Sequence, residues 1–186
     1  MRVVSLNHDA LAEYCERLAK EIKEEEFYPD IIIGVKSGGA ELAKLFHRHF
    51  NDSPCQLGFC HPLRKVTDKK KKKLAHHIKR LPVPFLNLLR IMEAKIIFKK
   101  KSRKDFIDLK LPDNISSYNQ ILVVDDAVDS GATLKYVLNG IKSANPTATT
   151  RFAAITVTSR HPASMPDYYI FNNETLVRFP WSIDAK

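Results

Sequence analysis

The stretch from Ile121 to Thr133 reads ILVVDDAVDSGAT, and it decides the fold that we expect for the whole chain. Four apolar residues typical of a strand run directly into two carboxylates, Asp125 and Asp126. A turn of small residues follows, and a helical pattern opens at Ala132. In open α/β sheets, ligands bind beyond the carboxyl ends of the strands, and the start of a helix offers free N–H groups to an anion. The stretch therefore predicts a site for a phosphorylated ligand.

The residues of this stretch differ in the part of the ligand that they suit. Gly131 lets the backbone approach closely, and the hydroxyls of Ser130 and Thr133 can add hydrogen bonds to a phosphate. The carboxylates of Asp125 and Asp126 would repel a phosphate, so we expect them to bind another part of the same molecule. Sugar hydroxyls suit them, because ionised carboxylates only accept hydrogen bonds.

The same residues closely resemble the phosphoribosyl pyrophosphate (PRPP) motif of type I phosphoribosyltransferases, in which four apolar and two acidic residues precede a loop ending in Gly-x-Thr. The resemblance implies that Asp125 and Asp126 hold the ribose 2′- and 3′-hydroxyls. It implies that the loop around the 5′-phosphate consists of Asp129, Ser130, Gly131, Ala132 and Thr133. It also implies that Asp129 acts as general base or orients the nucleobase, and that Mg²⁺ accompanies PRPP, reaching Asp125 and Asp126 through water.

A second strand–loop–helix unit has the same chemistry nearer the start of the chain. Residues 31–35 form a continuous apolar run, as in a strand buried on both faces, and residues 40–50 have a helical pattern. Between them the two glycines permit unusual backbone angles, successive N–H groups can form an anion-binding nest, and a lysine adds positive charge. This loop resembles the family's pyrophosphate loop, which often contains a non-proline cis peptide bond. The residues implied are Lys36, Ser37, Gly38 and Gly39.

The C-terminal segment resembles the hood of purine-type phosphoribosyltransferases, particularly the xanthine-guanine-like members, through PDYY at 166–169 and FPW at 179–181. In these relatives an aromatic residue stacks on the base and the next residue reads its edge; Leu176 and Val177 hold those positions, and Leu176 has no ring to stack. The relatives also carry a lysine after the preceding strand, where this chain has residues 159–161. The resemblance implies a purine acceptor, and the positions assigned to it are Arg160, His161, Leu176 and Val177. Trp181 is expected in the packed core.

Composition indicates one domain over residues 1–186. The net charge of +9 favours an anionic partner, for which a polyphosphate substrate suffices. The three cysteines are too few for a disulfide framework, and Met1 to Leu11 lacks the apolar core of a signal peptide. We therefore expect a cytoplasmic protein, and a homo-oligomer because family members usually associate.

Residues 63–119 are unusual for this family. They contain the lysine run Lys69–Lys73, an apolar stretch with helical spacing at 85–98, and a second basic run at 99–104. Family members have a mobile loop in this interval, so we expect a basic, helical insertion that includes that loop, with the hood at 159–186. A contact with an anionic membrane surface or with nucleic acid is an alternative, because basic residues flank an apolar helix. Few aromatic residues are interleaved, which weakens the nucleic-acid alternative.

The sequence thus predicts an α/β protein with the type I phosphoribosyltransferase fold, in which helices flank a central, mainly parallel sheet. The expected activity is transfer of the 5-phosphoribosyl group from PRPP to a nucleobase, with release of pyrophosphate, as in purine salvage. Two other classes stay open: a catalytically silent sensor of PRPP or a nucleotide, and a nucleic-acid or membrane-surface protein that uses the lysine-rich segment Lys69–Lys104 on the same fold.

Overall fold

The structure is a computed structural model, and it describes residues 2–51, 54–64, 106–172 and 174–182 together with Asn87 and Ile91. Most of the expected basic insertion, with its lysine runs and mobile loop, lies outside the described residues, as do the last residues of the expected hood. Asn87 and Ile91 are both helical, in agreement with the helix expected over 85–98.

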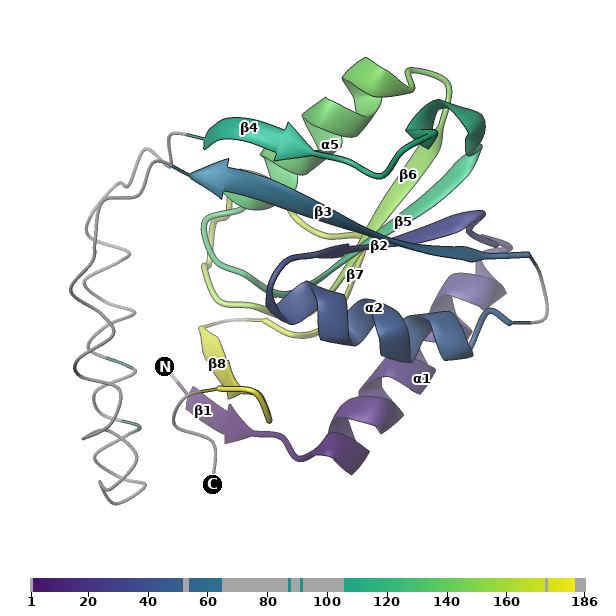
Figure 1. Cartoon of the computed structure of the whole chain (residues 1–186). Coiled ribbons are helices and arrows are strands. Elements are labelled where there is room, and N and C mark those ends of the chain that lie inside the picture. The colour runs from purple at the N-terminus through teal and green to yellow at the C-terminus, as the bar shows by residue number, and fades with distance from the viewer. Residues whose placement is uncertain are drawn as a thin grey trace.

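A six-stranded sheet with the order β4-β3-β2-β5-β6-β7 forms the centre of the fold (Figure 1). Neighbouring strands are parallel except for β3 and β4, which are antiparallel. The expected α/β fold with a mainly parallel central sheet is confirmed. In chain order the strands are β2 (Ile31–Val35), β3 (Gln56–Arg64), β4 (Phe106–Lys110), β5 (Gln120–Val128), β6 (Thr149–Val157) and β7 (Tyr168–Phe171).

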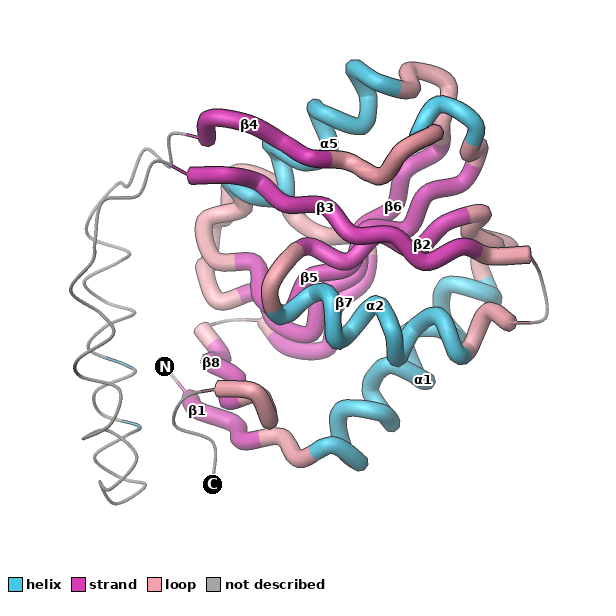
Figure 2. The backbone as a smooth tube through the Cα atoms, in the orientation of Figure 1, coloured by secondary structure: helices cyan, strands magenta, loops and turns pink. Residues whose placement is uncertain are grey.

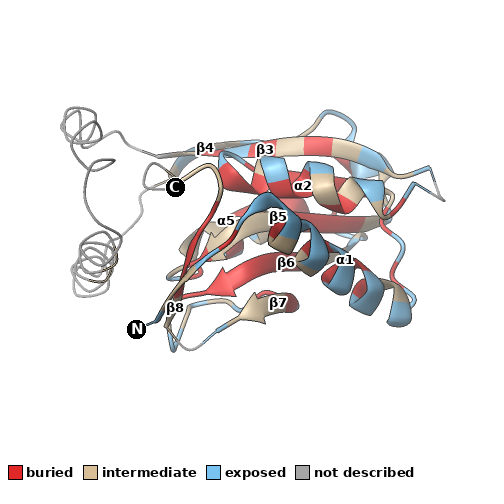
Figure 3. Ribbon diagram, turned by 90° about the horizontal axis from the view of Figure 1, so that it is seen from below, coloured by how far each residue is buried: buried red, intermediate tan, exposed pale blue. Residues whose placement is uncertain are grey.

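Helices cover both faces of this sheet (Figure 2). On one face α1 (His8–Glu24) and α2 (Gly38–Arg48) pack against alternate strand residues such as Ile32 and Leu122. On the other face α5 (Ala132–Ala144) packs against Ile33 and Val123, and the short 3-10 helix η1 (Ile115–Ser117) lies beside it. Because successive strand residues point to opposite faces, the central strands are buried along most of their length, as the red second half of β6 shows (Figure 3). Within the described residues, no helix has the length and apolar character that crossing a membrane requires.

Strand β5 is longer than the apolar pattern predicts. The sequence places its end at Val124, whereas the strand continues to Val128. Pairing with β6 persists beyond the apolar run, with Asp125 opposite Ala154 and Val128 opposite Val157. The prediction of the strand end was therefore wrong, and both acidic residues are strand residues with a fixed backbone.

A second, two-stranded sheet joins the start of the chain to its C-terminal segment. Strand β1 (Arg2–Ser5) pairs in parallel with β8 (Thr175–Arg178), and Leu6 N–H donates to the Arg178 carbonyl over 2.9 Å. The Arg178 guanidinium is buried and donates both to Ser5 Oγ and to Asn87 Oδ1, each over 2.8 Å. The C-terminal segment thus divides, because β7 joins the main sheet while β8 pairs with the chain start.

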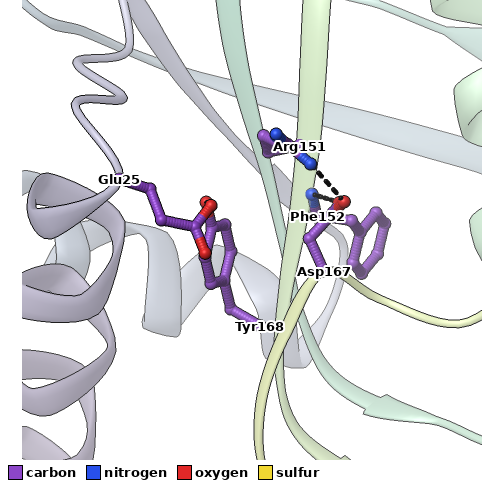
Figure 4. Close-up of polar contacts among 5 residues, drawn as sticks. All are labelled: Glu25, Arg151, Phe152, Asp167 and Tyr168. Carbon is purple, nitrogen blue, oxygen red and sulfur yellow. Dashed lines mark hydrogen bonds and ion pairs between the residues drawn. The ribbon is translucent and has the colours of Figure 1, made fainter.

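Polar contacts near the start of β6 fix the position of β7 (Figure 4). Asp167 accepts hydrogen bonds from Arg151 Nη1 over 3.0 Å and from Phe152 N–H over 2.8 Å. The fully buried Tyr168 donates its hydroxyl to Glu25, directly after α1, over 2.8 Å. Burial raises the pKa of Tyr168, so its hydroxyl remains a neutral donor at physiological pH. These contacts tie α1 and β6 to the last strand of the sheet.

We expect Tyr168→Phe to lower the free energy of unfolding by about 1 kcal/mol, because the variant loses a hydrogen bond to a charged acceptor that water can still reach. Urea unfolding followed by fluorescence measures the change. Tyr169→Phe is the matched control, since Tyr169 packs against the opposite core cluster and its hydroxyl bonds to no described residue. Equal losses from the two variants would contradict a role for the contact with Glu25.

Candidate active site

A cavity of about 440 Å³ lies at the carboxyl ends of β2, β3 and β5 and at the start of α5. Its volume falls within the range of small-molecule sites. The residues that we predicted for PRPP and that line this cavity are Lys36, Ser37, Gly38, Asp125, Asp126, Asp129, Gly131 and Thr133. Gly39, Ser130 and Ala132 belong to the same two loops without lining the cavity. The two strand–loop–helix units therefore contribute to one site.

The loop after β2 approaches the acidic pair so closely that it has no room for side chains. A Cβ atom added to Gly38 would overlap the Asp126 carboxylate, and one added to Gly39 would overlap the Val124 carbonyl. Neither glycine has a positive φ, so space rather than an unusual backbone angle requires them, contrary to our expectation. The peptide bond between Lys36 and Ser37 is cis. Helix α2 begins at Gly38, earlier than predicted, and Gly38 also lines the cavity, so the first turn of α2 lies at the site.

The loop after β5 is held by the segment that follows β6. Gly131 has a φ of 71° and precedes the first residue of α5. A Cβ atom there would lie 2.6 Å from the backbone nitrogen of Ser164, so glycine is required for both conformation and space. The Ala163 N–H donates to the Ser130 carbonyl over 2.8 Å. The loop thus presents the start of α5 to the cavity in a fixed position.

The acidic pair concentrates negative charge at the cavity wall. Asp125 Oδ1 accepts a hydrogen bond from Asp126 N–H over 2.9 Å, and Asp126 Oδ2 accepts one from Trp181 Nε1 over 3.3 Å. Burial raises the pKa of Asp125 well above its usual value, and the charge of Asp126 raises it further. Burial also raises the pKa of Asp126. Neither carboxylate forms an ion pair with a described residue, so the pair suits a ligand that brings donors or a cation.

The carboxylate oxygens at the cavity fit a magnesium ion that is held mainly by water and substrate. The described residues contain no group of three or more His, Cys, Asp or Glu side chains able to hold a metal ion by themselves. Mg²⁺ prefers oxygen ligands, usually keeps several waters, and often binds through one or two carboxylates plus substrate phosphates. Asp125 and Asp126 provide those carboxylates at the cavity.

The four positions predicted for the nucleobase do not line the cavity. Arg160 is exposed and pairs with Glu174 over 2.8 Å, and His161 is exposed in the same loop. Leu176 and Val177 lie in β8 and are buried, with 7% and 6% of their surfaces exposed. Their contact with a base therefore stays a prediction.

Among the side chains that the sequence analysis did not assign to the site, the structure brings three with hydrogen-bonding groups to the cavity or to its aspartates. His61 lines the cavity from β3. Trp181, expected in the core, is half-buried, stacks on Phe179 with 5.1 Å between ring centroids, and donates to Asp126. Thr158 follows β6 and donates its hydroxyl to Asp129. Of these three residues, only His61 could have been found from the sequence, because it directly follows an apolar run that is typical of a strand.

Comparison with known proteins agrees with this geometry. A model of the phosphoribosyl transferase domain matches residues 5–185. The chain belongs to this family. The expected phosphoribosyltransferase enzyme class and fold are thereby confirmed, while a search of curated proteins gave no match.

Solved structures of other phosphoribosyltransferases share the fold. A purine phosphoribosyltransferase from Pyrococcus horikoshii has a TM-score of 0.65 at 21% identity, over 98% of this chain and 95% of its own. The xanthine-guanine-hypoxanthine phosphoribosyltransferase of Helicobacter pylori has a TM-score of 0.68 at 16% identity, over 98% and 96%. A hypothetical protein from Neisseria gonorrhoeae with bound ppGpp has a TM-score of 0.62 at 15% identity, over 97% and 89%. At these identities the likeness shows the fold.

We expect Asp126→Asn to raise the free energy of unfolding at pH 7 by about 1 kcal/mol, as is common when a strained functional charge is removed. The pKa of Asp126 in the folded protein is raised above its ordinary value of 3.8. The parent protein therefore loses stability as the pH rises from 3.8 through this raised pKa. The advantage of the variant should therefore be present at pH 7 and fade as the pH falls toward 4.

Urea unfolding at the two pH values measures this difference. Asp113→Asn serves as the control, since Asp113 is exposed and does not line the cavity, and it should change stability little at either pH. A gain of the same size at both pH values would show that the charge of Asp126 is not its cause.

Proposed function

We propose that the chain transfers the 5-phosphoribosyl group from PRPP to a ring nitrogen of a nucleobase and releases pyrophosphate. The observation that carries this proposal is that both predicted loops open into one cavity with complementary chemistry. The side of β2 and α2 offers Lys36 and a helix start, which favour anions, and the β5 side offers Asp125 and Asp126, which accept from hydroxyls. Membership of the phosphoribosyl transferase domain family supports the same reaction class.

In the proposed complex the ribose 2′- and 3′-hydroxyls donate to Asp125 and Asp126. The 5′-phosphate binds the loop at the start of α5, made of Asp129, Ser130, Gly131, Ala132 and Thr133. The pyrophosphate binds the loop at the start of α2, made of Lys36, Ser37, Gly38 and Gly39. Each phosphate group thus meets the positive end of a helix dipole.

The proposed reaction is a displacement at C1 of the ribose. The base nitrogen forms a bond to C1 while the bond from C1 to the pyrophosphate oxygen breaks, and the proton of the base nitrogen passes to Asp129. Positive charge develops on the ribose beside Asp125 and Asp126, and negative charge develops on the leaving group beside Lys36. Mg²⁺, when bound with PRPP, would supply further neutralisation of the pyrophosphate. Catalysis is then mainly positioning and electrostatics.

We propose that the acceptor is a purine. We also propose that the protein acts in the cytoplasm as a homo-oligomer. The enzymes from Pyrococcus horikoshii and Helicobacter pylori, which share the fold, act on purines by name. The PDYY and FPW pieces of the tail and the place of Asp129 at the cavity agree with a purine imidazole nitrogen as nucleophile.

A sensor of PRPP or of a nucleotide is the second candidate. It is favoured by the position of Arg160, His161, Leu176 and Val177 outside the cavity, which leaves Asp129 as the one residue of the described cavity lining that is assigned to a base. The fold relative from Neisseria gonorrhoeae holds ppGpp, a nucleotide that carries pyrophosphate groups. A sensor would bind such a ligand without turnover.

The deciding assay is pyrophosphate release from PRPP with Mg²⁺ in the presence of hypoxanthine, xanthine, guanine, adenine, uracil or orotate. Turnover with one purine is the expected result. Binding of PRPP in calorimetry without turnover on any base would favour the sensor, and absence of PRPP binding would contradict the proposed site.

We expect Asp129→Asn to lower kcat about 10² to 10⁴-fold with little change in the affinity for PRPP, because the amide cannot take up the proton. Asp125→Asn provides the contrast, since it should weaken PRPP binding through the lost contact with the ribose. Steady-state kinetics and calorimetry separate the two effects. Equal turnover by Asp129→Asn and the parent would remove Asp129 from the mechanism.

A further inference from the structure

We propose that Thr158 is a positioning residue that holds the carboxylate of Asp129 so that one chosen oxygen meets the acceptor. This inference rests on the proposed function and concerns how the general base is oriented. It depends on a side chain that does not line the cavity but donates a hydrogen bond to Asp129, which does.

Two hydrogen bonds join Thr158 to the end of β5. The Thr158 N–H donates to the Val128 carbonyl over 3.0 Å, and its hydroxyl Oγ1 donates to Asp129 Oδ1 over 2.7 Å. Thr158 follows the last residue of β6 and is 3% exposed, so water does not compete freely for its hydroxyl. The backbone hydrogen bond fixes the position of Val128, directly before the phosphate loop. The side-chain hydrogen bond fixes the carboxylate of Asp129, the first residue of that loop.

The chemistry of Thr158 and Asp129 determines which of the two donates the hydrogen bond. An ionised carboxylate only accepts hydrogen bonds, so the single hydroxyl proton of Thr158 points to Asp129. This occupies Oδ1, whereas Oδ2 makes no hydrogen bond to any residue that the structure describes. Because Asp129 lines the cavity, Oδ2 is the oxygen left to take a proton from the acceptor. The β-branched side chain of Thr158 has few rotamers, which keeps the donor in place.

A neighbouring threonine separates positioning from plain structural support. Thr156 lies in β6, two residues before Thr158, is 1% exposed, and donates its hydroxyl to the Thr175 carbonyl over 2.7 Å. Thr156 and Thr158 therefore each contribute one buried side-chain hydrogen bond of the same length. Only the bond of Thr158 ends on the proposed general base.

The test compares Thr158→Val, Thr158→Ser and Thr156→Val in the full chain, with PRPP, Mg²⁺ and the base that the parent accepts. Thr158→Val should lower kcat about 10-fold or more, a part of the 10² to 10⁴ assigned to a general base, and change KM for PRPP little. Thr158→Ser, which keeps the hydroxyl, should restore most of kcat. Thr156→Val should keep the parent kcat although it loses comparable stability in urea.

A double-mutant cycle adds a readout that a structural role would not move. If Thr158 acts through Asp129, Thr158→Val should cause no further loss of kcat in an Asp129→Asn background. An unchanged kcat in Thr158→Val, a loss matched by Thr156→Val, or an equal loss in the Asp129→Asn background would each overturn the proposal for Thr158 alone. Absence of turnover by the parent on every base would instead overturn the proposed function, and the role of Thr158 with it. Should Thr158→Val fail to fold, Thr158→Ala removes the same hydroxyl and enters the same comparisons.

Discussion

The close approach of the loop after β2 to Val124 and the acidic pair of β5 is the constraint on which the site depends. The strands are neighbours in parallel register, with Gly34 opposite Val124, so β2 ends beside the acidic pair while β5 continues to Val128. The loop after β2 then lies directly against the acidic pair, and there is no space for a side chain at Gly38 or Gly39. Parallel pairing of two central strands therefore determines that both loops open into one cavity rather than two.

This arrangement is unfavourable for the folded protein without its ligand. Two adjacent carboxylates are held in a partly buried position, where burial raises the pKa of both and the charge of Asp126 raises the pKa of Asp125 further. Trp181 and the Asp126 N–H supply hydrogen bonds that offset a part of this cost. Under the proposed function, the ribose hydroxyls of PRPP and its Mg²⁺ would supply further interactions with the pair.

Features that depend on residues close together in the chain could be predicted from the sequence. Contacts between residues far apart in the chain required the structure. The strand–loop–helix units at 31–50 and 121–144 were predictable, because apolar runs, glycines and acidic residues follow one another locally. The end of β5 was predicted too early, since parallel pairing with β6 overrides the polarity of Asp125. The hydrogen bonds from Trp181 and Thr158 join segments far apart in the chain, so no local pattern could indicate them.

The pairing of β1 with β8 has a consequence for the order in which the molecule is completed. During synthesis β1 emerges early and has no sheet partner until Thr175–Arg178 has left the ribosome, whereas the strands from β2 to β7 can already pair with one another. Trp181, which reaches Asp126, follows β8. A nascent chain that has formed its main sheet therefore still lacks one of the side chains that contact the acidic pair. Its candidate site is completed by nearly the last residues that the structure describes.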